Sequence, residues 1–301
     1  MWFLAGDPCD GGSINELDLT VGIYGADSWA FDGEGSLHFW GTNGVYKTTI
    51  PGTPKCISEI RLPKLVKSEK VNPADYRITM AYDRLRSGIL ICITKLSDGS
   101  NSNYWYDLRT VGEDGVGGFF PESYGNNRGA YSLFHYGAND ADYRDLLIGC
   151  TDGHIRKFNE ALKSDNDTDD AAGVGTVLID SYATFGPIQL ARDPKFKGKI
   201  TGLDLISAGG GVTDGSQPDS NDVDCKIFVA SSAEKVIEKL YADTNPNFSK
   251  TIKAPGRRRG NTIKRKIAGV YAGIKLQNDT AGETWGFEQL LMAIKKSGKF
   301  K

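Results

Sequence analysis

The sequence predicts an all-β protein, and three observations support this class. Short apolar segments are joined by turns that contain Gly44, Gly99 and Gly153, at intervals of 55 and then 54 residues. The 301 residues include 37 glycines and 10% aromatic residues, a composition typical of many turns with aromatic packing. Four-stranded units that repeat at roughly 40 to 50 residues are typical of β-propeller blades. Residues 1–172 are therefore predicted to form partial or compact β-propeller-like repeats.

Each repeat contains three or four short predicted strands. They are Ser28–Phe31, Leu37–Trp40 and Val45–Lys47 in the first unit, Arg77–Tyr82, Gly88–Thr94 and Tyr104–Leu108 in the second, and Ala130–Tyr136, Asp145–Gly149 and His154–Phe158 in the third. Asp152-Gly153 between apolar segments predicts a hairpin with a type I′ turn, which needs φ > 0 at both central residues. Leu17–Ile23 alternates like a strand and could supply part of another blade. Because propellers have about four to eight blades, these repeats predict an open arc that another domain or chain completes.

Residues 173–301 are predicted to form a β-sandwich-like C-terminal domain. Its predicted strands include Thr176–Phe185, Lys199–Ser207 and Cys225–Ser231, and Ala233–Ala242 has the propensity of a short helix. The last two segments, Thr262–Gln277 and Thr284–Lys295, alternate on either side of the turn at Asn278–Gly282, which predicts a long hairpin.

Composition limits the classes of partner. A net charge of −2 gives no overall field toward nucleic acid or membrane. The five scattered cysteines are predicted to be reduced thiols in a protein folded in a cytoplasm, with Cys92 and Cys150 inside apolar strands. The N-terminus has no basic region of a signal peptide, and no apolar stretch approaches the roughly 20 residues of a membrane helix. We therefore expect no membrane-spanning segment.

Catalytic and metal-binding patterns are weak. The histidines, His38, His135 and His154, lie on predicted strands, and their spacing gives no reason to expect convergence on a metal. Asp165–Asp169 matches the first half of an EF-hand calcium loop, but Asp170 and Thr176 stand where that loop needs Gly and Glu. A linker between domains is the preferred interpretation, with calcium as the alternative. We predict no enzyme, no catalytic residues, no cofactor and no metal.

One local concentration of charge does indicate a contact site. Six basic residues fall within ten positions: Arg257, Arg258, Arg259, Lys264, Arg265 and Lys266. Such a segment could contact phosphates without reading bases. It could equally be a solvated strand edge or part of a subunit interface. These six residues are the predicted nucleic-acid or interface contacts.

Several phrases resemble the β-propeller region of bacteriophage tail proteins. They are WYDLRT (Trp105–Thr110), GGFFPESY (Gly117–Tyr124) and LLIGCTDGHIRKF (Leu146–Phe158), and the ending, with Gly282, Trp285, Glu288 and Gly298-Lys299, is similar to the C-terminal domain of such proteins. The chain also resembles the nozzle or tail tubular proteins of short-tailed phages. The resemblance implies a structural component of a phage virion (tail, neck or nozzle), assembled in the host cytoplasm, that oligomerises around the DNA channel.

The same resemblance implies several partners: further copies in a ring, other tail or portal-proximal proteins, and DNA passing non-specifically. An alternative is a propeller-type glycan-binding or glycan-cleaving module. Its support is the aromatic set Trp40, Tyr104, Trp105, Tyr106, Phe119 and Phe120. A third possibility is an intracellular propeller scaffold that binds peptides.

Overall fold

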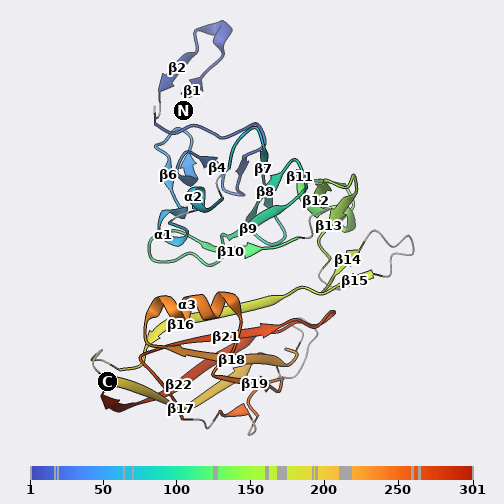
Figure 1. Ribbon diagram of the computed structural model, residues 1–301. Coiled ribbons are helices and arrows are strands. Elements are labelled where there is room, and N and C mark those ends of the chain that lie inside the picture. The colour runs from blue at the N-terminus through green and yellow to red at the C-terminus, as the bar shows by residue number, and fades with distance from the viewer. Residues whose placement is uncertain are drawn as a thin grey trace. The chain divides into compact units, whose positions relative to one another are not determined.

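The protein consists of two compact units, Met1–Phe158 and Asn159–Lys301, which we call the N-terminal and C-terminal units (Figure 1). The computed structural model describes residues 2–16, 18, 20–63, 65–69, 71–124, 128–159, 163–167, 175–191, 193, 196–209, 219–258, 261–263 and 266–299. The predicted boundary between residues 172 and 173 lies outside them. Most regular structure is strand, which confirms the all-β class.

Three successive antiparallel sheets form most of the N-terminal unit, and in each one every strand pairs with the next along the chain. Sheet 1 contains β3 (Trp29–Phe31), β4 (Ser36–Gly41), β5 (Gly44–Thr49) and β6 (Lys55–Cys56). Sheet 2 contains β7 (Tyr76–Asp83), β8 (Gly88–Lys95), β9 (Asn101–Asp107) and β10 (Gly118–Glu122). Sheet 3 contains β11 (Ala130–His135), β12 (Leu146–Cys150) and β13 (Ile155–Lys157). Among the described residues, no sheet closes on itself.

The three turn glycines occupy equivalent places, which confirms the repeat in strand order. Each lies where the second and third strands of its sheet meet, and each has a positive φ: 147° at Gly44, 69° at Gly99 and 86° at Gly153. The predicted type I′ turn is wrong, because Asp152 does not adopt a positive φ. Its carboxylate instead accepts a hydrogen bond from the His154 amide (3.0 Å), and only the closing glycine is left-handed.

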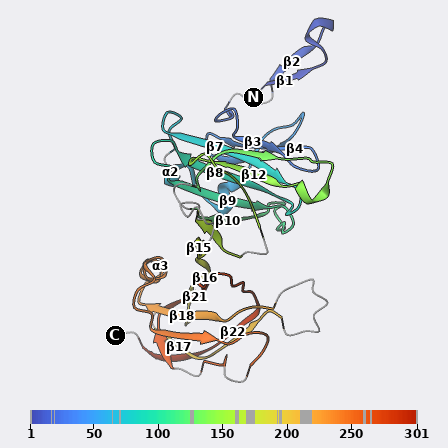
Figure 2. The same cartoon turned by 90° about the vertical axis from the view of Figure 1, so that its right-hand side faces the viewer.

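The start of the chain differs from the prediction. β1 (Trp2–Ala5) and β2 (Ser13–Glu16) form a separate hairpin around a short 3-10 turn at Pro8–Asp10, and it extends away from the three sheets (Figures 1 and 2). The strand predicted over Leu17–Ile23 is wrong, since none of its described residues is in a strand. Here the chain crosses sheet 1 instead, where Val21 packs against the core.

Two short helices follow sheet 1, and one short turn interrupts sheet 3. They are α1 (Ser58–Arg61), α2 (Leu65–Glu69) and a 3-10 turn at Ala141–Tyr143.

Two hydrophobic clusters join the three sheets in series. The first contains Trp40 and Val45 of sheet 1 together with Ile89 and Tyr106 of sheet 2. The second lies on the opposite face of sheet 2 and joins it to Leu146, Ile148 and Cys150 of sheet 3. Sheet 2 is therefore covered on both faces, whereas sheets 1 and 3 each give one face to this core.

The C-terminal unit contains two larger sheets. One has the order β16-β21-β18-β19 and the other β20-β17-β22. The strands are β16 (Ser181–Gln189), β17 (Phe196–Ser207), β18 (Val223–Ala230), β19 (Phe248–Ile252), β20 (Ile267–Gly269), β21 (Tyr271–Asn278) and β22 (Phe287–Lys299). A hairpin of β14 (Asp165–Asp167) and β15 (Gly175–Val177) precedes them. One cluster of buried side chains contains residues of both sheets, including Leu203, Ile227 and Ile274.

The long hairpin predicted at the C-terminus is wrong. β21 lies between β16 and β18, and β22 pairs with β17 in the other sheet. β21 is buried along nearly its whole length, as expected for a central strand with a partner on each side. Alternation in the sequence identified both strands, but it could not identify their partners.

The predicted helix over Ala233–Ala242 is confirmed as α3, which covers the first of these sheets (Figures 1 and 2). The Ser232 hydroxyl accepts a hydrogen bond from the Lys235 amide (3.3 Å) and caps its start. Val236 and Leu240 are one turn apart and pack against Phe228. None of the helices in the described ranges is long and apolar enough to cross a membrane.

Candidate functional site

The predicted basic contacts lie on a loop of the C-terminal unit, residues 255–266, which we call the basic loop. It connects β19 to β20. Arg257, Arg258 and Lys266 are exposed on it. Arg259, Lys264 and Arg265 are outside the described residues, so the structure places half of the predicted set.

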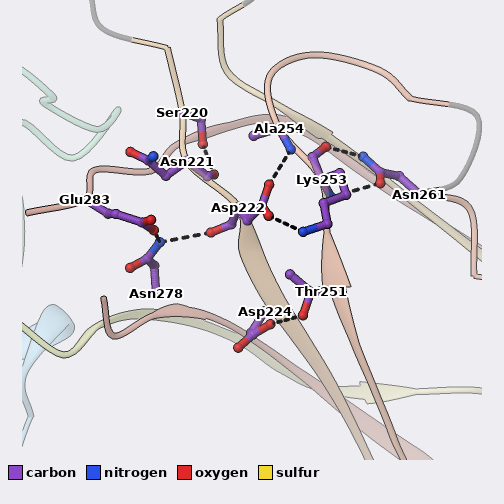
Figure 3. A network of polar contacts seen from close by, with 10 residues as sticks. All are labelled: Ser220, Asn221, Asp222, Asp224, Thr251, Lys253, Ala254, Asn261, Asn278 and Glu283. Carbon is purple, nitrogen blue, oxygen red and sulfur yellow. Dashed lines mark hydrogen bonds and ion pairs between the residues drawn. The ribbon is translucent and has the colours of Figure 1, made fainter. Parts of the chain in front are cut away.

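Asn261 ties the middle of this loop to Lys253, which directly follows β19. Its side chain is buried, with only 3% of the residue exposed. The Asn261 Oδ1 accepts a hydrogen bond from the Lys253 amide (3.0 Å), and its Nδ2 donates to the Lys253 carbonyl (2.7 Å) (Figure 3). One amide side chain thus satisfies both backbone groups of a residue that has just left β19, in the way a neighbouring strand would.

Asp222 binds the same point from the other side. Its carboxylate accepts a hydrogen bond from the Ala254 amide (3.0 Å) and forms an ion pair with Lys253 Nζ (2.6 Å) (Figure 3). The hydrogen bond from Lys253, then that from the Ala254 amide, and the nearby charge of Arg258 lower the pKa of Asp222. Asp222 therefore stays ionised and keeps a negative charge near Arg258.

The network continues to the end of β21. Asn278 Nδ2 donates to the Asp222 carbonyl (2.9 Å) and to Glu283 Oε2 (2.8 Å). Asn221 then pairs with the backbone of Thr284, through its own amide (2.8 Å) and its side-chain oxygen (3.1 Å). These hydrogen bonds connect the residues that hold the basic loop to the start of β18, the end of β21 and the segment before β22.

Further along, the loop is attached to the second sheet. The Ser207 hydroxyl donates to the Gly256 carbonyl (3.2 Å), and Ile263 and Leu203 exchange backbone hydrogen bonds of 2.8 and 3.1 Å. Arg258 Nε donates to the Pro255 carbonyl within the loop (3.3 Å). The exposed guanidinium groups therefore stand on backbone that is fixed at several points. Such an arrangement can present positive charge to phosphate or carboxylate groups at little conformational cost.

Sequence reasoning found the charge but missed the residues that position it. Asp222 and Asn278 lie at the ends of strands, where polar side chains commonly satisfy the free backbone groups, whereas Asn261 lies in the middle of the basic loop. That position was the one available signal, and it does not identify a partner.

The three histidines have separate environments. His38 is buried on β4, where Nε2 contacts Asp32 Oδ2 at 3.0 Å, and burial lowers its pKa. His154 is exposed in the turn before β13, near Asp152 (3.5 Å), while His135 ends β11. No group of three or more His, Cys, Asp or Glu side chains that could hold a metal ion is found among the described residues. In the calcium-like stretch, residues 168–170 lie outside them.

All five cysteines are free, and Cys92, Cys150 and Cys225 are buried. Burial raises the pKa of the Cys225 thiol to about 12, so it behaves as a small apolar group.

The aromatic set proposed for sugar binding is largely structural. Trp40, Trp105 and Tyr106 are only 1%, 6% and 2% exposed. Tyr104 donates a hydrogen bond to Glu69, and the ring of Phe119 packs at a tilt against Tyr106, with centroids 4.6 Å apart. In this set, Phe120 alone is largely exposed.

The fold and the site define an all-β protein of two units with a basic loop fixed on a polar network. In comparisons with known proteins, no family model matches the chain, and no curated protein matches it.

Proposed function

We propose that this protein is a structural component of a phage virion, in the tail, neck or nozzle, and that it assembles into a ring around the DNA channel. The observation that carries the proposal is the basic loop. It exposes Arg257 and Arg258 on a base held by Asn261 and Asp222. In this role the protein acts by assembly and non-specific phosphate contact and has no catalytic function.

The N-terminal unit supports the proposal by its strand order. The first strands of the three sheets, β3, β7 and β11, lie next to one another in series, and the sheets stack face to face outward from them. First strands line the centre in a β-propeller, so we assign this unit as an open propeller arc. The two sheets of the C-terminal unit around one core fit a β-sandwich.

The phosphate contact is tested by binding to duplex DNA of mixed sequence at several salt concentrations. Each lost phosphate contact reduces the slope of log K against log salt by about 0.9. The double variant Arg257→Ala/Arg258→Ala should therefore reduce the slope by about 1.8 if both contact phosphates. A matched control, Arg84→Ala/Lys235→Ala, removes the same charge from exposed positions outside the loop.

The control should leave the slope within about half a unit of the parent, because its residues contact no phosphate. Equal losses in both double variants would show that net charge alone drives binding and would contradict the role of the loop. Electron microscopy of the purified protein tests the ring directly.

A further inference from the structure

Sheet 3 has an uncovered apolar face. Phe134 lies opposite Leu147 in the strand register, and Gly149 lies opposite Ile155, so these four residues share one face, with Lys157 of the edge strand β13 beside Leu147. It is the face opposite to Leu146, Ile148 and Cys150, which form the core with sheet 2. Phe134 is 61% exposed and Ile155 is 74% exposed. We call these four residues the outer face of sheet 3.

Sheet 1 ends the stack on the other side and has a similar face. Trp29 lies opposite Phe39, and Phe31 lies opposite Leu37, on the face away from sheet 2. The segment around Val21 covers Phe39 and Leu37, but Trp29 and Phe31 remain 42% and 46% exposed. We call Trp29 and Phe31 the outer face of sheet 1. Both ends of the stack therefore expose large apolar side chains on their first strands, β3 and β11.

The repeat indicates what covers these faces. Inside the chain, sheet 1 packs on sheet 2 and sheet 2 packs on sheet 3, and each contact brings two first strands together. The next partner in that series for sheet 3 is another sheet of the same kind. Among the three sheets of the N-terminal unit, in the described part of the chain, sheet 1 is the one besides sheet 3 whose outward face does not pack on another sheet. Within one copy of the protein, sheet 1 and sheet 3 lie at opposite ends of the stack, so their outer faces cannot pack on each other.

We propose that the outer face of sheet 3 packs on the outer face of sheet 1 of a second copy of this protein, with β11 next to the partner's β3. The contact is heterologous, since it joins two different surfaces, and repetition around a rotation axis closes a ring. This inference rests on the proposed function and names the interface of its ring.

The shape of the surface agrees with this contact. A hollow of about 390 Å³ lies at the β12–β13 turn of sheet 3; Gly149 and Ile155 of the outer face line it, together with Leu96, Tyr131, Ser132, Cys150, Thr151, Gly153 and His154. Gly149 leaves room there for the Ser132 hydroxyl, which a β-carbon at that position would meet at 2.5 Å. An aromatic side chain of the size of Trp29 or Phe31 fits such an apolar depression, and buried aromatic anchors of this kind carry most of the binding energy of an interface.

The test compares the mass of the full chain by sedimentation velocity over a range of concentrations. Phe134→Ser and Trp29→Ser alter opposite ends of the stack, and each should weaken association about tenfold or more, as expected for an aromatic at the centre of an interface. Tyr241→Ser is the control, because Tyr241 is 84% exposed on α3 of the C-terminal unit and belongs to neither outer face. It should leave association unchanged, and far-ultraviolet circular dichroism should show that all three variants are folded.

Cross-linking identifies the pairing. In a Cys9→Ser/Cys56→Ser background, which removes the exposed and the partly buried native thiols, Phe134→Cys and Trp29→Cys chains are treated with a short bismaleimide. Mixed chains should cross-link, and each variant alone should not. Cross-linking of Phe134→Cys with itself would indicate a symmetric contact and overturn the inference, as would a monomer at every concentration. A ring that Phe134→Ser leaves intact would overturn this interface alone, while the salt slope of Arg257→Ala/Arg258→Ala judges the proposed function separately.

Discussion

Asn261 provides the sharpest test of how the basic loop is held. The variant Asn261→Ala removes two hydrogen bonds to Lys253, of 3.0 and 2.7 Å, from a site that is 3% exposed. Each such bond contributes about 1 kcal/mol, so the loop should open about 2 kcal/mol more easily. This free energy corresponds to about a thirtyfold increase in the open population.

Hydrogen exchange followed by mass spectrometry measures how often the basic loop opens, peptide by peptide. Peptides that cover residues 253–263 should exchange about thirty times faster in Asn261→Ala, while peptides from the N-terminal unit should keep their rates. Thr262→Ala is the matched control, because it deletes a polar side chain of the same loop that takes no part in the network in Figure 3. Exchange that is the same in both variants would refute the role assigned to Asn261.

Three further predictions concern the N-terminal unit. Because burial lowers the pKa of His38, the unfolded chain binds a proton more readily, so stability should fall as the pH drops below about 6.5; thermal melts of the parent and of His38→Gln measure this. Gly88→Ala should destabilise the unit by about 1–3 kcal/mol, because the new β-carbon would lie 2.2 Å from the buried ring of Trp105. With Ellman's reagent, exposed Cys9 should react in the native protein, whereas Cys92, whose pKa burial raises, should react only on unfolding.

Each of these has a contrary outcome. A parent and a His38→Gln variant with equal slopes of melting temperature against pH would show that another group titrates. Gly137→Ala is the control for Gly88→Ala, because its β-carbon would meet nothing within 4 Å. Equal melting temperatures for these two variants would contradict the packing argument. Rapid reaction of a second thiol class that maps to Cys92 would show that sheet 2 opens easily.

Local patterns in the sequence were sufficient for elements whose partners are near in the chain. The turn glycines identified the second and third strands of three sheets, because a glycine at a positive φ marks where adjacent strands meet. Val236 and Leu240 at helical spacing, between Ser232 and Asp243, define α3. In both cases the determining contacts lie within a few residues.

Pairing between distant strands was not predictable in the same way. The segments that form β21 and β22 alternate and are separated by a turn, which are the features of a hairpin, yet each pairs with strands far earlier in the chain. Burial of the whole of β21 depends on β16 and β18, and nothing in its own residues names them. The residues that hold the basic loop could not be predicted either. Asp222 and Asn261 are ordinary polar residues in the sequence, and only the fold brings them to Lys253.

The pairing of β22 with β17 has a consequence for synthesis on the ribosome. Residues 287–299 complete a sheet that began at residues 196–207, so the C-terminal unit cannot finish folding until residue 299 has left the exit tunnel. In sheets 1, 2 and 3 every strand pairs with its neighbour along the chain, so these sheets can form one after another as they emerge. Under the proposed function, nascent chains would then expose the outer faces of sheets 1 and 3 before the basic loop is in place, so subunits could meet before they bind nucleic acid.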